Sequence, residues 1–378
     1  MNDDQALDLL EQLVAIPSPS TQEHDAVEFL CSQMRSLGFD AHIDPAGNAV
    51  GTIGDTGPEL CLLGHIDTIP GEVPVRREKG RLHGRGAVDA KGCLAAFVSS
   101  TARAHAAGHL KARVQVVGCV EEEATSSKGA RYRATLDAPD AVIVGEPSHW
   151  DAVTLGYKGF LQTRCSFTES LAHTASDRTS AAAQACHAFV ALEKEVADYN
   201  AKQSNLFDSL LIHLDDMSSE SDGRIEHAHL DIKLRLPGEL PPDLAEQWLR
   251  ERIGTSWVRC GGGIEAWCGP RTATLPRLLA RSIARTGGRA RFQRKTGTAD
   301  LNIVAPAWGC PALAYGPGDS ALDHTPDEYI SMEEYVKGVA VLTHFLGQEN
   351  LGDIVQSHTP SAEEIAKERE AVPTSPLP

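Results

Sequence analysis

Three short apolar segments in the first part of the chain each end directly in side chains that can bind a metal ion. Gly64-His65-Ile66-Asp67 follows the segment Glu59–Leu63, Glu121-Glu122-Glu123 follows Val114–Val120, and Gly145-Glu146 follows Ala141–Val144. Runs of this length predict buried strands. Amphipathic helices alternate with them, and we predict these at Asp4–Leu13, His24–Leu37 and Lys91–Ala107. The alternation favours an α/β fold with a central, mostly parallel sheet, whose strand ends meet at one edge and form the ligand site.

A chain of 378 residues is longer than one compact core usually needs, so we expect two domains. Between Gly159 and Trp267 no dense motif of acidic residues and histidine occurs, and the α/β pattern resumes at Leu275. We therefore predict a catalytic domain in two parts, 1–157 and 270–350, interrupted by an inserted α+β domain at 158–269. Within the insert, the pattern predicts strands at Phe160–Phe167 and His229–Leu236 and helices at Ser180–Val196 and Leu244–Ile253. The segment 351–378 is rich in Pro, Ser, Glu and Lys, and we predict a flexible tail there.

The chain carries 52 acidic and 35 basic residues, which gives a net charge of −17. This balance argues against nucleic acid or an anionic membrane as the main partner, because both bind positive surface patches. No run approaches the roughly 18 to 20 apolar residues of a transmembrane helix. The acidic start Met1-Asn2-Asp3-Asp4 does not fit a signal peptide, and the nine cysteines are scattered without a CxxC pair. We therefore expect a cytoplasmic protein with reduced thiols.

Two motifs combine a candidate metal ligand with a supporting group or loop. His65 and Asp67 point to the same face of an extended chain, so Asp67 could fix the tautomer of a metal-binding His65; a purely structural histidine is the alternative. Asp89 lies in the glycine-rich segment Gly84–Gly92, which matches neither the dinucleotide-binding nor the phosphate-binding loop pattern. Such a loop could deliver the Asp89 carboxylate to a metal, or Asp89 could simply begin the following helix.

The remaining candidates are glutamates at strand ends and one histidine. A run such as Glu121–Glu123 is usually a solvated face, but at a strand end one glutamate could bind a metal while its neighbour serves as a general base. Glu146 follows the next strand, where a turn is the alternative, and His324 follows a Gly-Pro-Gly turn, where a surface histidine is the alternative. Together, two histidines and three carboxylates predict a pair of zinc-like divalent ions. The absence of GxSxG and HExxH motifs argues against a serine hydrolase and a single-zinc protease.

In these motifs and their order, residues 5–347 resemble the co-catalytic zinc aminoacylase and carboxypeptidase family, which includes acetylornithine deacetylase and succinyl-diaminopimelate desuccinylase. The resemblance implies two zinc ions, for which cobalt could substitute. It implies that His65 and Glu146 hold one ion, that Glu123 and His324 hold the other, and that Asp89 bridges both. It also implies a cis peptide bond between Asp89 and Ala90. It further implies that Asp67 orients His65 and that Glu122 is the general base activating the attacking water.

The same resemblance implies that the insert is a four-stranded, two-helix lid through which two subunits form a homodimer. Glu169-Ser170-Leu171-Ala172-His173 resembles the lid segment whose histidine reaches the partner's active site and stabilises the oxyanion. By the same resemblance, Arg235 and Thr298 would bind the carboxylate end of the substrate.

Two segments, Thr154–Gly159 and Lys295–Asp300, are most similar to one branch of this family, which releases lysine or ornithine from a small acidic amino-group carrier protein. The charge pattern bears on this independently. Between Glu265 and Asp300 there is no acidic residue, so the segment carries +8 and the rest of the chain −25; the basic residues are Arg271, Arg277, Arg281, Arg285, Arg289, Arg291, Arg294 and Lys295. This basic strip, Arg271–Lys295, is either an ordinary solvated helix face or a docking site for the acidic carrier.

The sequence thus predicts a dizinc amidohydrolase that releases lysine and/or ornithine from the carrier by hydrolysing a γ-glutamyl amide in amino-acid biosynthesis. Two alternatives stay open. An N-acetylornithine deacetylase or succinyl-diaminopimelate desuccinylase would remove a small acyl group instead. A non-catalytic, metal-free binding protein would keep the fold without the chemistry.

Overall fold

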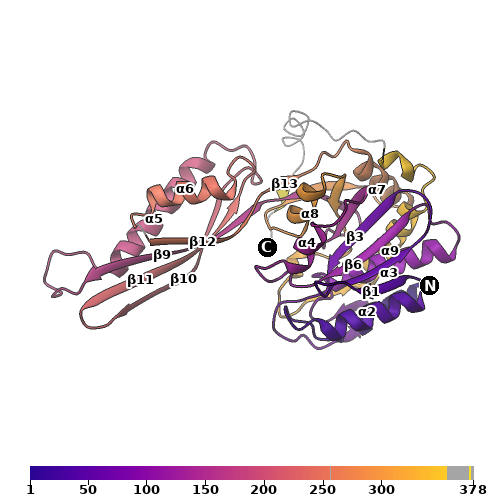
Figure 1. Ribbon diagram of the computed structural model, residues 1–378, viewed down its shortest axis with the longest axis horizontal. Coiled ribbons are helices and arrows are strands. Elements are labelled where there is room, and N and C mark those ends of the chain that lie inside the picture. Colours follow the sequence, from indigo (N-terminus) through magenta and orange to yellow (C-terminus); the bar gives the residue numbers. More distant parts are fainter. Residues whose placement is uncertain (256, 356–373, 376–378) are drawn as a thin grey trace.

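The computed structural model describes residues 1–255, 257–355 and 374–375, and most of them are organised by two separate sheets (Figure 1). The main sheet contains, in spatial order, β1 (Asp40–Ile43), β2 (Ala49–Ile53), β6 (Arg113–Cys119), β3 (Glu59–His65), β7 (Ala141–Gly145), β15 (Ala312–Ala314), β8 (Ala152–Tyr157), β14 (Arg291–Lys295) and β17 (Thr374–Ser375). A short strand, β13 (Trp267–Cys268), pairs with β8. The central strands β6, β3, β7 and β15 are parallel, which confirms the predicted α/β class.

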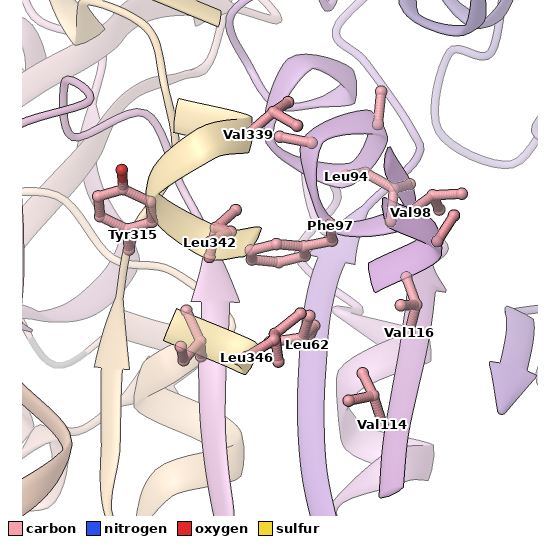
Figure 2. Close-up of a cluster of buried hydrophobic side chains, with 14 of the residues drawn as sticks. Leu62, Leu94, Phe97, Val98, Val114, Val116, Tyr315, Val339, Leu342 and Leu346 are labelled. Carbon is pink, nitrogen blue, oxygen red and sulfur yellow. The ribbon is translucent and has the colours of Figure 1, made fainter. Parts of the chain in front are cut away.

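Helices cover both faces of the main sheet, which explains why its central strands are apolar on both sides. On one face lie α1 (Asp3–Val14), α2 (His24–Ser36), α3 (Lys91–Ala106), α7 (Thr274–Arg285) and α9 (Met332–Leu346). On the other lie α4 (Lys128–Arg133) and α8 (Leu301–Trp308). Figure 2 shows the first of these cores, in which Leu62 of β3 lies close to Phe97 of α3 and Leu346 of α9, and Val116 of β6 lies on the side of Leu94 and Val98 of α3.

The second sheet has its own core and extends away from the main sheet (Figure 1). Its strand order is β10 (Leu211–Ser221), β11 (Ile225–Leu236), β9 (Gly159–Ser170) and β12 (Trp257–Ile264), and all its pairings are antiparallel. Alternate residues of β9 and β11 are buried against α5 (Ala181–Asn200) and α6 (Pro242–Arg252). The chain enters this body after β8 and leaves it before β13, as an insert would require.

Small elements complete the fold around the strand ends. A three-stranded sheet contains β16 (Tyr329–Ser331), β5 (Arg81–His83) and β4 (Arg76–Glu78), and a 3₁₀ turn, η1 (Ser320–Leu322), precedes His324. No helix in the described parts of the chain has the length and apolarity needed to cross a membrane.

The predicted tail begins too early. Leu351–Ile354 form a 3₁₀ turn, η2, whose Leu351 and Ile354 are buried in the core beside α7, so these residues are not part of a flexible segment. Thr374 and Ser375 form β17, which pairs with β14 at the edge of the main sheet. The rest of the predicted tail lies outside the described residues.

Candidate metal centre

The topology brings the predicted ligands to one edge of the main sheet. His65 ends β3, and its neighbour in β6 is Cys119, two residues before Glu121. The register between β3 and β7 places Gly64 beside Gly145, so Glu146 leaves the sheet at the same level. Asp89 comes from the loop before α3, and His324 from the loop between η1 and β16. His65, Glu123 and Glu146 therefore lie at or just after the ends of strands that finish at the same edge of the sheet, and Asp89 and His324 reach this edge from loops.

The Asp89 carboxylate lies between two imidazoles. One of its oxygens is 3.1 Å from Nε2 of His65, and the other is 3.0 Å from Nε2 of His324. His324 Nε2 is also 2.9 Å from Oε1 of Glu123. One ligand atom each of His65, Asp89 and Glu123 lies within 4.8 Å of the others, a grouping that can hold a metal ion. A carboxylate with one oxygen toward each histidine has the arrangement needed to bridge two cations.

Glu122 and Glu146 complete the site from the walls of a cavity of about 470 Å³. Burial raises the pKa of Glu146 to about 8 and also raises the pKa of Glu122. Burial alone would raise the pKa of Asp89 too, but its hydrogen bonds with His324 and His65 outweigh that effect and lower it. Carboxylates gathered in one enclosed space repel one another unless cations compensate their charge. The residues present therefore fit a dinuclear metal site.

Asp67 supports the centre in a different way from the one expected. Nδ1 of His65 lies 3.0 Å from the backbone oxygen of Asp67, closer than the 3.6 Å to its carboxylate. The carboxylate instead accepts hydrogen bonds from the backbone N–H groups of Glu122 and Glu123, both at 3.0 Å, and from the hydroxyl of Ser20 at 2.7 Å. An Nδ1–H donated to the carbonyl leaves Nε2 of His65 free to bind a cation. Asp67 thus orients His65 through its backbone and holds the two glutamates through its side chain.

The two predicted substrate-binding residues are brought together although Arg235 lies in the second sheet and Thr298 in the loop between β14 and α8. Nη1 of Arg235, on β11, donates to the Thr298 hydroxyl at 2.9 Å, and that hydroxyl donates to the backbone oxygen of Lys158 at 3.1 Å. The Arg235 guanidinium also lies over the Phe160 ring, with 4.9 Å to its centroid. Arg235, Phe160 and Thr298 line the cavity that holds the metal ligands.

His173 is the one predicted site residue that this chain does not bring to the centre. It is exposed in the loop between β9 and α5, where its Nδ1 accepts a hydrogen bond from Ala175 N–H. Figure 1 shows this loop at the far end of the second sheet. Since β9 leaves the main sheet at Gly159 and runs to Ser170, the separation is on the order of 35 Å along the strand. Within one chain, His173 has no access to the cavity.

The basic strip is not continuous on the surface. Arg294 is fully buried, with its guanidinium over the Phe207 ring, and Lys295 is buried and lines the cavity, where it donates to the backbone oxygen of Pro147. Assigning these two residues to a docking surface was wrong, because β14 is an inner strand at this point. Lys295 is a site residue that we missed, although its position at a strand end before Gly297-Thr298 follows the rule that identified the acidic ligands.

The exposed arginines of α7 run away from the cavity. Arg277, Arg281 and Arg285 are exposed along this helix, as its sequence spacing predicts. In β14, Lys295 pairs with Tyr157 at the cavity end of β8, whereas Arg291 pairs with Ala152 at its start. The chain passes from Arg285 to Arg291 by a short turn, so the C-terminal end of α7 lies at the end of the sheet remote from the metal ligands. Of the residues in the strip, Lys295 at its C-terminal end lines the cavity, and the exposed arginines of α7 do not.

Comparison with known proteins agrees with this architecture. Residues 61–348 match the family described as peptidase family M20/M25/M40. The chain is 43% identical to a LysW-lysine hydrolase of Deinococcus radiodurans, over 90% of this chain and 96% of the relative. It is 27% identical to a LysW-lysine/LysW-ornithine hydrolase of Sulfurisphaera tokodaii, over 91% of this chain and 95% of that one.

Solved structures share the fold at low sequence identity. A metallo-carboxypeptidase of family M20 from Sulfolobus solfataricus superposes with a TM-score of 0.76 at 17% identity, covering 92% of this chain and 99% of that one. Human carnosine dipeptidase 1 superposes with a TM-score of 0.68 at 16% identity, covering 94% and 97%. The family match, the sequence similarity and the shared fold agree, and the chain belongs to peptidase family M20/M25/M40.

Proposed function

We propose that this protein is a dinuclear metal-dependent amidohydrolase that releases lysine or ornithine from an amino-group carrier protein by hydrolysing a γ-glutamyl amide. The observation that carries the proposal is the Asp89 carboxylate, whose two oxygens face the imidazoles of His65 and His324. The choice of substrate is supported by the similarity to the LysW-lysine hydrolase, which extends over 90% of this chain.

The metals we propose are two zinc ions, with cobalt as a substitute. His65 and Glu146 would hold one, Glu123 and His324 the other, and Asp89 both. Imidazole and carboxylate donors suit zinc. When bound, such a pair of divalent ions polarises an amide carbonyl and lowers the pKa of water.

Glu122 is the proton carrier in this proposal. Its side chain lines the cavity beside the ligands, and its backbone N–H is held by Asp67. The carboxylate takes a proton from the attacking water as the oxygen adds to the amide carbon, and it gives that proton to the nitrogen as the C–N bond breaks. The products are a free carboxylate on the carrier and the amine of the released amino acid.

In this proposal the substrate is oriented by one group from the second sheet and one from the loop after β14. The guanidinium of Arg235 and the hydroxyl of Thr298, 2.9 Å apart, offer hydrogen bonds to the α-carboxylate of the leaving amino acid. His173 would contribute only across a homodimer, in which the lid body 158–269 of one subunit approaches the cavity of the other. The proposed active site therefore includes a carboxylate-binding pair, Arg235 and Thr298, and a histidine supplied by the second subunit.

The carrier is expected to meet the exposed arginines of α7 and the N-terminal end of the basic strip. A surface of Arg277, Arg281 and Arg285 attracts an acidic protein and speeds its encounter at low salt. We place the reaction in the cytoplasm, which fits nine free cysteines within the described residues.

The decisive experiment compares substrates and two neighbouring glutamates. Purified protein loaded with zinc or cobalt is assayed against carrier-linked lysine, carrier-linked ornithine, N-acetylornithine and N-succinyl-diaminopimelate. Glu122→Gln should retain the metals and lose roughly 10²–10⁴-fold in kcat. Glu121→Gln is the matched control, because the Glu121 carboxylate accepts from Ser126 and pairs with Lys128 outside the cavity. Normal turnover by Glu122→Gln would refute the role of Glu122 as proton carrier. Cleavage of the small acyl substrates alone would refute the carrier protein as the substrate and would identify a small-acyl hydrolase instead.

A further inference from the structure

A buried glutamate that the proposed chemistry does not use holds the loop of the bridging aspartate. Glu328 is fully buried directly before β16. Its Oε1 accepts hydrogen bonds from the backbone N–H groups of Val88 at 2.9 Å and Asp89 at 3.2 Å. Its Oε2 is 2.8 Å from Nη1 of Arg85, whose side chain is only 14% exposed. The Glu328 carboxylate therefore contacts the backbone of the candidate ligand Asp89 and the side chain of Arg85, three residues before Val88.

Two further hydrogen bonds hold the start of the loop that carries Asp89. Arg85 Nε donates to the backbone oxygen of Gly71 at 3.0 Å, and Gly84 N–H donates to the backbone oxygen of Glu328 at 3.2 Å. Glu328 also follows His324 by four residues. One short segment thus supplies a candidate ligand, His324, and the carboxylate that holds the loop of another, Asp89.

Glu328 has a counterpart on the other side of the centre. Asp67 accepts the backbone N–H groups of Glu122 and Glu123, one on each oxygen, and Glu328 accepts those of Val88 and Asp89 on one oxygen. In each case a buried carboxylate takes two successive amides of a loop that carries a candidate metal ligand. A charge-assisted pair of such bonds restricts the loop more strongly than neutral acceptors would.

We propose that Glu328, with Arg85 as its counter-charge, is a positioning residue that keeps the Asp89 carboxylate between His65 and His324 and thereby sets the affinity of the centre for its metals. The inference rests on the dinuclear site proposed above. It concerns the backbone of the ligand loop, because Glu328 contacts the amide of Asp89 and not its carboxylate.

The test uses a conservative change at Glu328 and a matched carboxylate elsewhere. Glu328→Gln keeps the shape and one acceptor oxygen, but it loses the charge and turns its amide toward Arg85 or toward the loop N–H groups. Glu334→Gln is the control, because Glu334 also accepts two backbone N–H groups, from Trp150 and Gly318 at 3.2 Å each, and pairs with His149 at 3.2 Å. Both variants are compared with the wild type by zinc-chelator competition, by the visible spectrum of the cobalt-loaded protein, and by urea unfolding of the metal-free protein.

We expect Glu328→Gln to weaken metal binding by roughly 10- to 100-fold and to change the cobalt spectrum. Glu334→Gln should lower the unfolding midpoint to a similar extent while leaving both metal measurements unchanged. Wild-type affinity and spectrum in Glu328→Gln would overturn the inference while leaving the dinuclear site intact. A wild-type protein that takes up no metal would overturn the proposed function itself, and the inference with it.

Discussion

Replacing Asp67 by Asn tests how the centre holds its glutamates. Asp67 is fully buried, and its two oxygens accept the Glu122 and Glu123 amides and the Ser20 hydroxyl. Asn has almost the same shape, but only one of its two terminal atoms accepts hydrogen bonds. Whichever way the new amide turns, its NH₂ group faces one of the two backbone N–H groups. Asp67→Asn therefore leaves one buried donor unpaired and converts the other bond from charged to neutral.

The expected cost follows from these two changes. A hydrogen bond to a charged group contributes about 1.5–3 kcal/mol, and a neutral one about 1 kcal/mol. The lost bond and the weakened bond together predict that Asp67→Asn lowers the free energy of unfolding by about 2–5 kcal/mol. Because the unpaired amide belongs to Glu122 or Glu123, we also expect looser glutamates, with kcat and metal affinity each reduced about 10- to 100-fold.

Urea unfolding of the metal-free protein, chelator competition and steady-state turnover measure the three effects. Ser20→Ala is the matched control, since it removes one donor to the Asp67 carboxylate and leaves both backbone bonds in place. It should cost no more than about 1 kcal/mol and leave turnover near the wild-type value. The reasoning fails if Asp67→Asn is as stable and as active as Ser20→Ala.

Three further predictions concern other parts of the structure. Lys158→Met should lower the free energy of unfolding by about 2–3 kcal/mol, because Lys158 donates to the backbone oxygens of Leu206, Phe207 and Ser209. Urea unfolding measures this loss, and Lys202→Met, at an exposed position, is the control that should show no change. In the metal-free protein the pKa of Glu146 is raised to about 8 by burial, and that of His324 to about 10 by its hydrogen bonds with Asp89 and Glu123. Both folded-state values exceed the ordinary ones, whereas burial lowers the pKa of Lys91 and of Lys158 to about 7, which acts in the opposite direction only above that pH. The free energy of unfolding should therefore fall as pH rises from about 4.5 to about 7, whereas zinc, which binds deprotonated ligands, should stabilise more as pH rises. Thermal unfolding with and without chelator tests this, and a metal-free stability that increases with pH over that range would contradict it. Replacing Arg277, Arg281 and Arg285 together by Ser should raise KM for carrier-linked lysine several-fold at low salt and leave KM for a small acyl substrate unchanged. The same replacement at the exposed Arg224, Arg252 and Arg259 is the control, and an equal effect there would argue against docking on α7.

The proposed metal ligands could be located from the sequence because their positions depend on local rules. A buried parallel strand is an apolar run, its end is marked by the first polar residues, and parallel neighbours end at the same edge. His65, Glu123 and Glu146 satisfy all three conditions. Asp89 and His324 lie on loops, and only their combination with the other three residues identified them.

Features that depend on tertiary contacts could not be located in this way. β10 was not predicted because most of its residues are exposed and polar, and β12 because it contains three consecutive glycines. The burial of Arg294 and Lys295 depends on which strand flanks β14, and that pairing leaves no periodic signal in five residues. The start of the tail was misplaced for a similar reason, since Leu351 and Ile354 are buried only because α7 lies beside them.

The connection between the two bodies places a structural constraint on substrate binding. The side-chain amide of Asn302 donates to the backbone oxygens of Tyr157, Lys158 and Glu265, at 3.3, 3.2 and 2.8 Å, so it holds the entering and leaving segments of the insert together. Arg235 belongs to the second sheet, yet it donates to Thr298, which in turn donates to the Lys158 oxygen that Asn302 also contacts. A carboxylate bound by Arg235 therefore acts on the same few atoms that join the two bodies. The proposed substrate contact and the orientation of the second sheet are coupled for this reason, because neither can shift without rearranging the hydrogen bonds around Lys158.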